Sequence, residues 1–312
     1  MKALVTGGAG FIGSWIVDSL ISEDFEVVVL DNLSSGSLKN FEHLEDKIAR
    51  VNFYEMDIRA LELWEIFEKE KPDYVFHAAA EISVRDSIEN PRKCEDVNVV
   101  GSLNVLRSCA EYGVKKFIFS STGGAIYGDG VRIPTPETEK EKPASPYGIS
   151  KLTLEKYLDF FKTVHGLDYV SLRYSNVYGP RQNADGEAGV VAIFIDNLLS
   201  GKKPRINGSG NQTRDYIYVK DVAGANLLAL NDSLSGIFNV GTGIETDVNE
   251  LYRRITKIMN LNVQAENMPA IKGEQMRSCL DAGKLIDAGW CIKYNLESGL
   301  QETICSFRGK VK

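Results

Sequence analysis

Tyr147 and Lys151 are the residues of this chain whose types and spacing point most directly to chemistry. A spacing of four residues puts both side chains on one face of a helix; Ser145 can cap that helix, and Pro146 suits its first turn. A phenol alone is a poor base at neutral pH because its pKa is about 10. A nearby ammonium group favours the phenolate and lowers that pKa. We therefore expect a proton acceptor for the interconversion of an alcohol and a ketone.

A glycine-rich turn near the N-terminus supplies the second half of such a reaction. Gly7, Gly10 and Gly13 follow an apolar strand and open a helix, with the spacing GxxGxxG rather than GxGxxG. Glycines there allow a tight turn and the close approach of a pyrophosphate, which binds the free N–H groups of the helix N-terminus. We expect a dinucleotide here, with Phe11 and Ile12 among its contacts.

Acidic residues after the next two strands suggest which dinucleotide binds. Asp31 ends the second strand, where a carboxylate accepts hydrogen bonds from the adenosine ribose and repels a 2′-phosphate. This favours NAD over NADP, the alternative being that Asp31 and Asn32 only begin a turn. Asp57 and Ile58 are placed to touch adenine, although Asp57 fits a helix cap equally well. Small residues after the fourth strand are expected beside the cofactor: Ala78, Ala79 and Ala80.

Alternation of apolar runs with amphipathic stretches predicts the fold. Strands are expected at Lys2–Thr6, Glu26–Asp31, Val51–Met56, Tyr74–His77, Lys116–Ser120 and Tyr169–Tyr174. Helices are expected at Phe11–Ile21, Ala60–Glu70, Glu95–Tyr112 and Pro146–His165. This order is typical of an α/β protein with a doubly wound parallel Rossmann sheet.

The regular alternation of strands and helices ends after Tyr174, where Val177–Gly189 is rich in Gly, Pro, Asn and Asp. Further elements are expected at Val190–Ser200, Lys203–Asn207, Gly236–Val240 and Asp247–Met259. We therefore expect an NAD-binding domain over residues 1–174 and a smaller mixed α/β substrate-binding lobe over 175–312, from which the chain crosses back in part.

Composition excludes several other classes of protein. A net charge of −7 argues against nucleic-acid binding, and no apolar window is long enough to span a bilayer. The N-terminus does not resemble a signal peptide. Five scattered cysteines without a CxxC motif indicate reduced thiols and a cytoplasmic protein. Three isolated histidines make a metal site unexpected.

With these features together, the chain resembles the extended short-chain dehydrogenase/reductase superfamily and, within it, the UDP-glucose (UDP-galactose) 4-epimerase group. The resemblance covers nearly the whole chain and rests on TGGAGFIGS at 6–14, DNLSSG at 31–36, HAAA at 77–80, SSTGGAIYG at 120–128, SPYGISK at 145–151, RYSNVYGPRQ at 173–182 and RDYIYVKDVA at 214–223. It implies a UDP-sugar substrate, a homodimer, and bound NAD that is reduced and reoxidised within one catalytic cycle.

The resemblance also implies roles for individual residues. Tyr147 takes the proton of the sugar 4-hydroxyl, Lys151 lowers its pKa, and Thr122 stands near the family serine, with Ser121 or Gly123 as alternatives. Asn98 supports this region or simply packs in its helix. Further cofactor contacts implied by these motifs are Asn32, Ser35, Gly36, Asn98, Ser120, Ser121, Tyr147, Lys151 and Tyr174, with Lys151 binding the nicotinamide ribose.

On the substrate side, the resemblance implies that Asn176 and Arg214 bind the diphosphate, with Arg181 either helping or lying exposed. Gly189 and Val190 would lie against the uracil. Ile271 stands where the family often has an arginine, for which Lys272 or Arg277 is the expected substitute, and Glu274 would bind the uridine ribose. Ser278 would line the sugar pocket, where a small residue leaves room for a 2-acetamido group.

Gly123 and Gly124 distinguish between reactions of this superfamily. The related 4,6-dehydratases carry Asp-Glu after the threonine, whereas this chain has no acid or base there. We therefore expect epimerisation at C4 of a UDP-hexose rather than elimination, and the glycines would leave room for the sugar to turn. The alternatives are epimerisation of UDP-glucuronate or of a hexosamine and, from another class, a non-catalytic NAD-sensing regulator.

Overall fold

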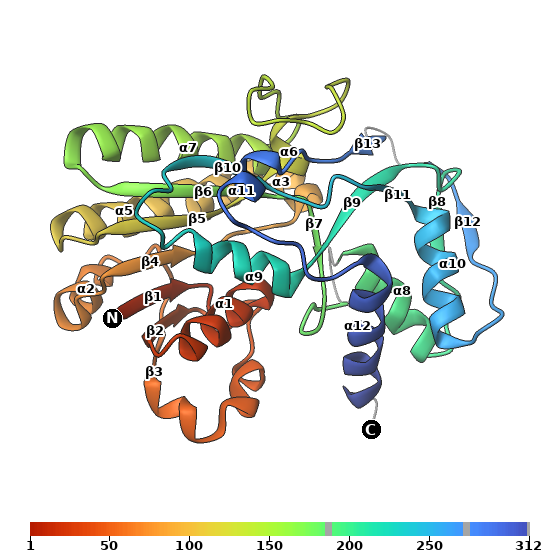
Figure 1. Cartoon of the computed structure of the whole chain (residues 1–312), viewed down its shortest axis with the longest axis horizontal. Helices are drawn as coiled ribbons and strands as arrows, with labels where there is room; N and C mark the ends of the chain where they lie inside the picture. The colour runs from red at the N-terminus through yellow and green to blue at the C-terminus, as the bar shows by residue number, and fades with distance from the viewer. Residues whose placement is uncertain (185–188, 271–274, 311–312) are drawn as a thin grey trace.

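A computed structural model describes residues 1–184, 189–270 and 275–310 of the chain. Its largest element is a seven-stranded sheet whose neighbouring strands are all parallel (Figure 1). In spatial order the strands are β10 (Gly236–Val240), β6 (Asp168–Tyr174), β5 (Lys116–Thr122), β4 (Tyr74–His77), β1 (Lys2–Thr6), β2 (Glu26–Asp31) and β3 (Val51–Glu55). The expected doubly wound parallel sheet is confirmed.

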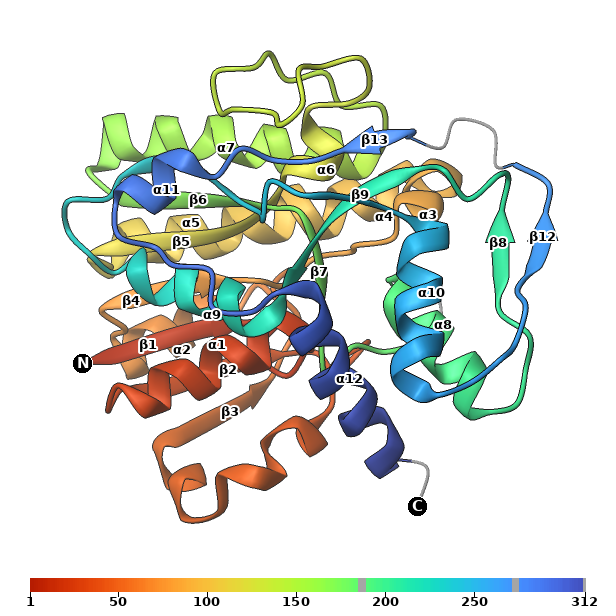
Figure 2. The same cartoon turned by 45° about the vertical axis from the view of Figure 1, so that its right-hand side comes forward.

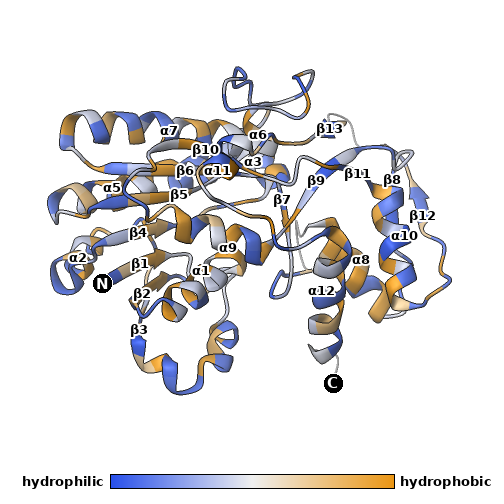
Figure 3. Cartoon of the chain, in the orientation of Figure 1, coloured by the Kyte–Doolittle hydropathy of each residue, from blue (hydrophilic) through white to orange (hydrophobic). Residues whose placement is uncertain are grey.

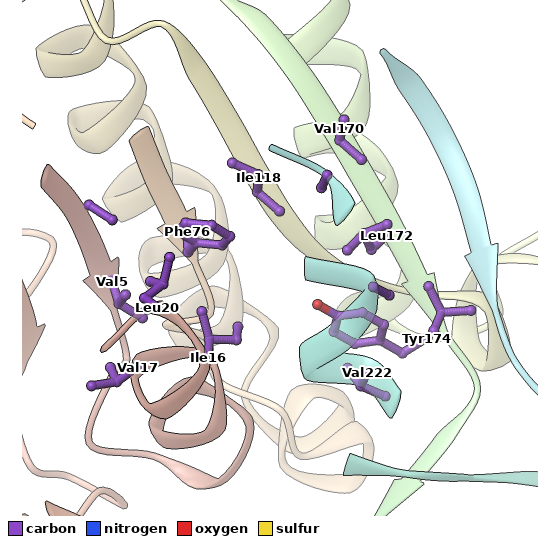
Figure 4. Packing of buried hydrophobic residues seen from close by; sticks show 14 of the residues in the cluster. Val5, Ile16, Val17, Leu20, Phe76, Ile118, Val170, Leu172, Tyr174 and Val222 are labelled. Carbon is purple, nitrogen blue, oxygen red and sulfur yellow. The ribbon is translucent and has the colours of Figure 1, made fainter. Parts of the chain in front are cut away.

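Helices cover both faces of this sheet, so its central strands are apolar on both sides. Within β1, Ala3 and Val5 face one core, whereas Leu4 faces the other. The first core is covered by α1 (Phe11–Ser22), α9 (Val219–Leu228) and α11 (Gly283–Asp287). The second is covered by α2 (Leu63–Glu70), α5 (Ser102–Glu111) and α7 (Pro146–His165). Figure 4 shows the first core, with Phe76 and Ile118 of the sheet near Leu20 of α1 and Tyr174 near Val222 of α9.

The expected single helix over Glu95–Tyr112 is wrong in detail. The chain forms α4 (Pro91–Glu95), a π-helical segment η2 (Asp96–Gly101) and then α5. Gly101 packs so closely that an added Cβ would lie 2.7 Å from Ile58 Cγ1. Hydrophobic periodicity does not distinguish a wider π-turn from an α-turn, because both keep one face apolar.

The smaller lobe has its own core (Figure 2). One sheet contains β11 (Glu245–Asp247), β9 (Thr213–Tyr218), β13 (Arg277–Ser278) and β7 (Asn176–Tyr178). A separate pair is formed by β8 (Arg205–Asn207) and β12 (Glu266–Met268). The lobe's helices are α8 (Val190–Leu199), α10 (Val248–Met259) and α12 (Leu296–Lys310). In Figure 3, α10 alternates hydrophilic and hydrophobic segments, as expected for a helix with one face on this core.

The chain returns to the large sheet after entering the lobe. The strand expected at Gly236–Val240 is β10, which pairs with β6 at the edge of the seven-stranded sheet, and α9 and α11 pack on the same sheet. The large sheet and its helices therefore contain residues from both sides of position 175.

The other helical segments in the described residues are η1 (Leu38–Arg50), α3 (Val84–Glu89) and α6 (Gly123–Ile126). None of the helices in the described ranges is both long and apolar enough to cross a membrane.

Candidate active site

One cleft at the carboxyl ends of the central strands gathers most of the residues expected to bind the cofactor. From the expected set, its lining contains Gly7, Gly10, Phe11, Ile12, Gly13, Asp31, Asn32, Ser35, Asp57, Ile58, Ala78, Ala79, Ala80, Ser120, Ser121, Tyr147, Lys151 and Tyr174. Residues that sequence reasoning missed complete the lining: Leu30, Ser34, Met56, Ile82 and Val97. They are sequence neighbours of expected contacts, which is the signal that could have found them. Such a crevice is where open parallel sheets bind ligands.

The glycine turn has the geometry that a bound pyrophosphate requires. Gly7 has φ +66°, and a Cβ on Gly13 would lie only 2.1 Å from Gly7 O. A Cβ on Gly10 would meet only Gly7 O within 4 Å and would enter the cleft. The α1 helix begins there without a side-chain cap. The N–H groups of its first turn are therefore available to an anion, and the residues present fit a dinucleotide.

Asp31 is buried at the end of β2. Its carboxylate accepts hydrogen bonds from the backbone N–H groups of Ala9 (3.0 Å) and Leu33 (2.8 Å). Burial raises the pKa of Asp31, and the hydrogen bonds from Leu33 and Ala9 oppose that shift. Gly36 packs on this carboxylate, because an added Cβ would lie 2.9 Å from Asp31 Oδ1. Asp31 therefore holds the glycine turn in place while it lines the cleft, and Gly36 supports it without lining the cleft.

Asp57 combines both of the roles considered for it. It lines the cleft, and its Oδ1 accepts the backbone N–H of Arg59 at 2.9 Å. The Arg59 guanidinium, hydrogen-bonded to Asp57, holds the pKa of that carboxyl well below its usual range. Asn32 donates to the other carboxylate oxygen of Asp57 at 2.9 Å, which ties the ends of β2 and β3 together.

Tyr147 and Lys151 lie on the first turns of α7, as expected. Ser145 caps this helix by accepting the Gly148 N–H at 3.1 Å, and Pro146 occupies the first position. The Lys151 ammonium donates to Ser120 O at 2.8 Å and lies 5.9 Å from the centroid of the Tyr147 ring. Burial lowers the pKa of Lys151 to about 8, which leaves the group mostly protonated at neutral pH.

The expected lowering of the Tyr147 pKa is not found. Burial raises the pKa of Tyr147 to about 12, and the opposing influence is a hydrogen bond from Thr122 rather than the charge of Lys151. The physical reason is that loss of water around the phenol disfavours the phenolate more than these neighbours favour it.

Thr122 is the hydroxyl beside the phenol. Its side chain is placed to lower the pKa of Tyr147, and it accepts the Ala125 N–H at 3.3 Å at the start of α6. Ser121, one of the alternatives for this role, donates instead to buried Glu155 at 2.7 Å. A proton can therefore pass between a substrate hydroxyl and the phenol oxygen of Tyr147, with the Thr122 hydroxyl beside these two oxygens.

Gly123 and Gly124 differ in what they face. A Cβ on Gly123 would lie 2.6 Å from both methyl carbons of Leu280, so this glycine packs against a buried side chain. A Cβ on Gly124 would lie 3.6 Å from Ser278 Oγ and 4.0 Å from Thr122 Oγ1. Of these two glycines, Gly124 is therefore the one that lies beside the proton-transfer groups without a clash, and Ser278 is its neighbour.

A buried ion pair that sequence reasoning missed supports the catalytic helix. Arg173 on β6 and Glu155 on α7 are both fully buried, and Arg173 Nη2 lies 2.6 Å from Glu155 Oε2. Glu155 also accepts the hydroxyls of Ser121 (2.7 Å) and Ser171 (2.9 Å). Arg173 also donates to Tyr127 Oη at 2.9 Å. Two sequence features could have predicted this pair: an arginine inside an apolar strand and a glutamate four residues after Lys151.

A second buried group, His77, fixes the segment Ala78–Ala80, which lines the cleft. His77 Nε2 lies 2.8 Å from Ser102 Oγ, and Nδ1 lies 2.7 Å from Thr6 Oγ1. Because Ser102 donates its proton to Asn98 O, it accepts from His77, and His77 accepts from Thr6 through Nδ1. This pattern needs a neutral ring, and burial lowers the pKa of His77 to about 3.

Asn98 is buried in η2 and does not line the cleft. It accepts the Glu81 N–H at 2.7 Å, donates to Glu81 O at 2.9 Å and donates to Ser150 Oγ at 3.0 Å. The π-helical turn thereby joins the segment after β4 to the first turns of α7. This placement agrees with a supporting role rather than a contact with the cofactor.

The residues expected to bind substrate are dispersed over the lobe. Asn176 is exposed on β7, and Gly189 and Val190 begin α8. Arg214 on β9 pairs in register with Ser278 on β13. Arg277 is exposed and paired with Glu245. Three other residues considered for substrate binding in this region lie outside the described residues: Ile271, Lys272 and Glu274.

Arg181, which sequence reasoning placed either at the diphosphate or on the surface, is mostly buried against α1. Its guanidinium lies over the ring of Trp15 on α1, with Cζ 4.2 Å from the ring centroid, and Nη2 lies 2.7 Å from Asp18 Oδ2. The structure therefore brings Arg181 to the cofactor helix and not among the residues that line the cleft. Among the described residues, no group of three or more His, Cys, Asp or Glu side chains is placed to hold a metal ion.

Comparisons with known proteins agree with this geometry. Residues 3–241 match the NAD dependent epimerase/dehydratase family. A putative UDP-glucose 4-epimerase of Methanocaldococcus jannaschii is 44% identical over 301 residues, which cover 96% of each chain. A solved UDP-glucose 4-epimerase of Thermotoga maritima, with UDP-glucose, superimposes with a TM-score of 0.96 at 48% identity and covers 100% of both chains.

A further solved structure is a UDP-N-acetylglucosamine 4-epimerase of Methanobrevibacter ruminantium, with a TM-score of 0.94 at 36% identity, covering 99% of this chain and 98% of that one. The resemblance inferred from the motifs, including its expected nicotinamide cofactor, is thus confirmed at the level of the family. The chain belongs to the NAD dependent epimerase/dehydratase family.

Proposed function

We propose that the protein is an NAD-dependent UDP-glucose (UDP-galactose) 4-epimerase. The single observation that carries the proposal is that Tyr147 and Lys151 line a dinucleotide cleft, with Thr122 beside the Tyr147 phenol. Relatives named as UDP-glucose 4-epimerases, similar over nearly the whole chain, support the choice of substrate class.

In this reaction Tyr147 accepts the proton of the sugar 4-hydroxyl and later returns it. Thr122, bonded to the phenol, orients the sugar oxygen, and Lys151 keeps a positive charge beside the developing phenolate. NAD, when bound, supplies the acceptor and donor of the C4 hydride. Gly7, Gly10 and Gly13 would hold its pyrophosphate, and Asp31 its adenosine ribose.

The surroundings of Gly124 favour epimerisation over elimination. Elimination of water needs an acid and a base beside the sugar, but Leu280 fills the space next to Gly123, and among the described residues only Ser278 and Thr122 come within 4 Å of a Cβ added at Gly124. Without those groups, a 4-keto sugar can only turn over and be reduced from its other face. The overall reaction is then redox-neutral and reversible.

The test is to incubate the purified protein with UDP-galactose, UDP-glucose and UDP-glucuronate and to identify the products by NMR. Interconversion of UDP-glucose and UDP-galactose supports the proposal. A 4-keto-6-deoxy sugar nucleotide or a UDP-pentose as main product would contradict it. Faster turnover of UDP-glucuronate would favour the glucuronate alternative, and NAD binding without any turnover would favour a sensing role.

Cofactor selection rests on Asp31. Its carboxylate at the cleft would repel a 2′-phosphate, so calorimetry on nucleotide-free protein should show far tighter binding of NAD than of NADP. Equal affinities for the two nucleotides would contradict this assignment of Asp31.

UDP-N-acetylhexosamines are proposed as additional substrates. Ser278 is small, and its hydroxyl lies beside Gly124, next to Thr122. A serine there leaves more room for a 2-acetamido group than a tyrosine would.

We also propose a homodimer formed through α7 and the neighbouring η2. Apolar side chains on one face of α7 are exposed, among them Phe160 at 48% and Val164 at 59%, and Val100 of η2 is 50% exposed. Such an apolar stripe is what a second copy would cover. Light scattering should give twice the chain mass, and Phe160→Glu should reduce it to the monomer mass.

A cytoplasmic location is proposed on the state of the cysteines. All five are free, and Cys94, Cys109 and Cys279 are buried, which suits a reducing compartment. Cell fractionation tests this location.

A further inference from the structure

Arg181 occupies a position between the two halves of the molecule. It follows β7 in the segment that leads from the large sheet to α8 (Figure 2). Its side chain is mostly buried and turns back to α1, whose first turn would hold the pyrophosphate. The contact therefore joins the cofactor helix to the start of the substrate lobe.

Three interactions make this contact specific. The Arg181 guanidinium lies over the Trp15 ring at 4.2 Å, and its Nη2 lies 2.7 Å from Asp18 Oδ2. Trp15 Nε1 donates to Pro180 O at 3.1 Å. Trp15 and Asp18 are three residues apart and so lie on the same face of α1. A planar guanidinium can stack and pair at once, which lysine does not do as well.

The backbone at Arg181 adopts a conformation that needs compensating contacts. Its φ of +71° lies in the left-handed region, which is uncommon for arginine. Such a conformation persists where surrounding contacts compensate for its cost. Here the compensating contacts are those with Trp15 and Asp18.

The same segment reaches the residues expected at the uracil. Gln182 Nε2 donates to Val177 O at 3.2 Å, which closes the turn around Arg181. A Cβ on Gly189 would lie 2.6 Å from Gln182 Nε2, so the start of α8 packs directly on this turn. Movement of Arg181 would therefore displace Gly189 and Val190.

We propose that Arg181 is a positioning residue that holds the UDP-binding side of the substrate lobe against the cofactor helix. The proposal rests on the proposed function, because it assigns Gly189 and Val190 to the nucleotide end of a UDP-sugar. That end lies away from the reacting C4, so loss of Arg181 weakens substrate binding without slowing the proton transfer.

The experiment compares Arg181→Asn with the wild type, both loaded with NAD. Asparagine tolerates the left-handed backbone but lacks the guanidinium. We expect the Kd of UDP by calorimetry and the KM of UDP-galactose to rise about tenfold, the loss expected of one charge-assisted hydrogen bond, with kcat and the Kd of NAD changed less than about twofold.

Three companion single variants and one double variant separate positioning from a general structural role. Asp18→Asn should reproduce the rise in KM, and the double variant should be no worse than either single variant if the pair acts as a unit. Arg50→Asn removes an exposed pair with Asp24 far from this contact and should leave KM unchanged. Arg181→Lys, the milder change, should fall between wild type and Arg181→Asn.

Failure of this inference and failure of the proposed function give different experimental results. If Arg181→Asn binds UDP as tightly as the wild type, the positioning role is wrong and the proposed function stands. If kcat, NAD affinity and UDP affinity fall together with thermal stability, the contact is only structural. If the wild type itself does not bind UDP, both this inference and the proposed function are overturned.

Discussion

The two sides of the cleft are built in different ways. The proton-transfer side takes Tyr147, Lys151 and Glu155 from successive turns of one helix and Thr122 from the end of a central strand. The substrate side takes Arg214 and Ser278 from paired strands that are more than sixty residues apart in the sequence. Local sequence thus arranges the first side, whereas the second depends on long-range pairing in the lobe.

This difference has a consequence for sensitivity to mutation. On the proton-transfer side, Lys151 and Glu155 are buried, and Glu155 accepts several hydrogen bonds, so a change there costs much in rate or stability. On the substrate side, Arg277 and Asn176 are exposed, and changes there should alter preference more than folding. Four predictions test this contrast, from the largest expected effect to the smallest.

The largest effect is expected for Tyr147→Phe. The change removes the proton acceptor and keeps the ring, so the protein should fold, retain NAD and lose roughly 10²–10⁴-fold in kcat, the usual contribution of a general base. Single-turnover kinetics measure the chemical step. A loss below about tenfold would mean that another residue is the base, and Tyr157→Phe, on an exposed part of the same helix, is the matched control.

The second prediction concerns the ion pair beneath the catalytic helix. Arg173→Met leaves Glu155 charged, buried and without its cation, which should lower the free energy of unfolding by about 3–5 kcal/mol. Urea denaturation measures this loss. Removing both charges, in Arg173→Met with Glu155→Gln, should recover part of it; a double variant that is less stable than the single variant would show that the charge is not the cause.

The third prediction is a dependence of stability on pH. Folding lowers the pKa of His77 to about 3 from a usual value near 6.5, so the unfolded chain binds the extra proton between these values. The stability from this group is therefore complete above about pH 6.5 and is lost as the pH falls, by about 2 kcal/mol at pH 5. His77→Gln should flatten this part of the profile, whereas His165→Gln, at the exposed end of α7, should not. Parallel profiles for wild type and His77→Gln would refute the assignment.

The smallest effect is expected on the substrate side. Ser278→Tyr should lower kcat/KM for UDP-GalNAc relative to UDP-galactose by at least about tenfold, because a phenol would occupy the space beside Gly124. Stability should change little compared with Arg173→Met. An unchanged ratio, or no activity of the wild type on UDP-GalNAc, would show that Ser278 does not line the sugar pocket.

Much of the fold and of the cofactor cleft follows from the sequence alone. Alternating apolar and amphipathic segments predict the parallel sheet, because strands buried on both faces need continuous apolar runs. Gly7, Gly10, Gly13 and Asp31 follow from the requirements of a dinucleotide turn, and the Tyr147–Lys151 pair follows from helix periodicity. These features are local, so neighbouring residues suffice to indicate them.

Other features required the tertiary structure. The stacking of Arg181 on Trp15 and the packing of Gly123 against Leu280 could not be read from the sequence. Burial, not the charge of Lys151, dominates the pKa of Tyr147. The Arg173–Glu155 pair and the return of β10 to the large sheet also join residues that are distant in sequence. Each depends on which side chains the folded chain brings together and on how much water they lose, and spacing along the sequence specifies neither.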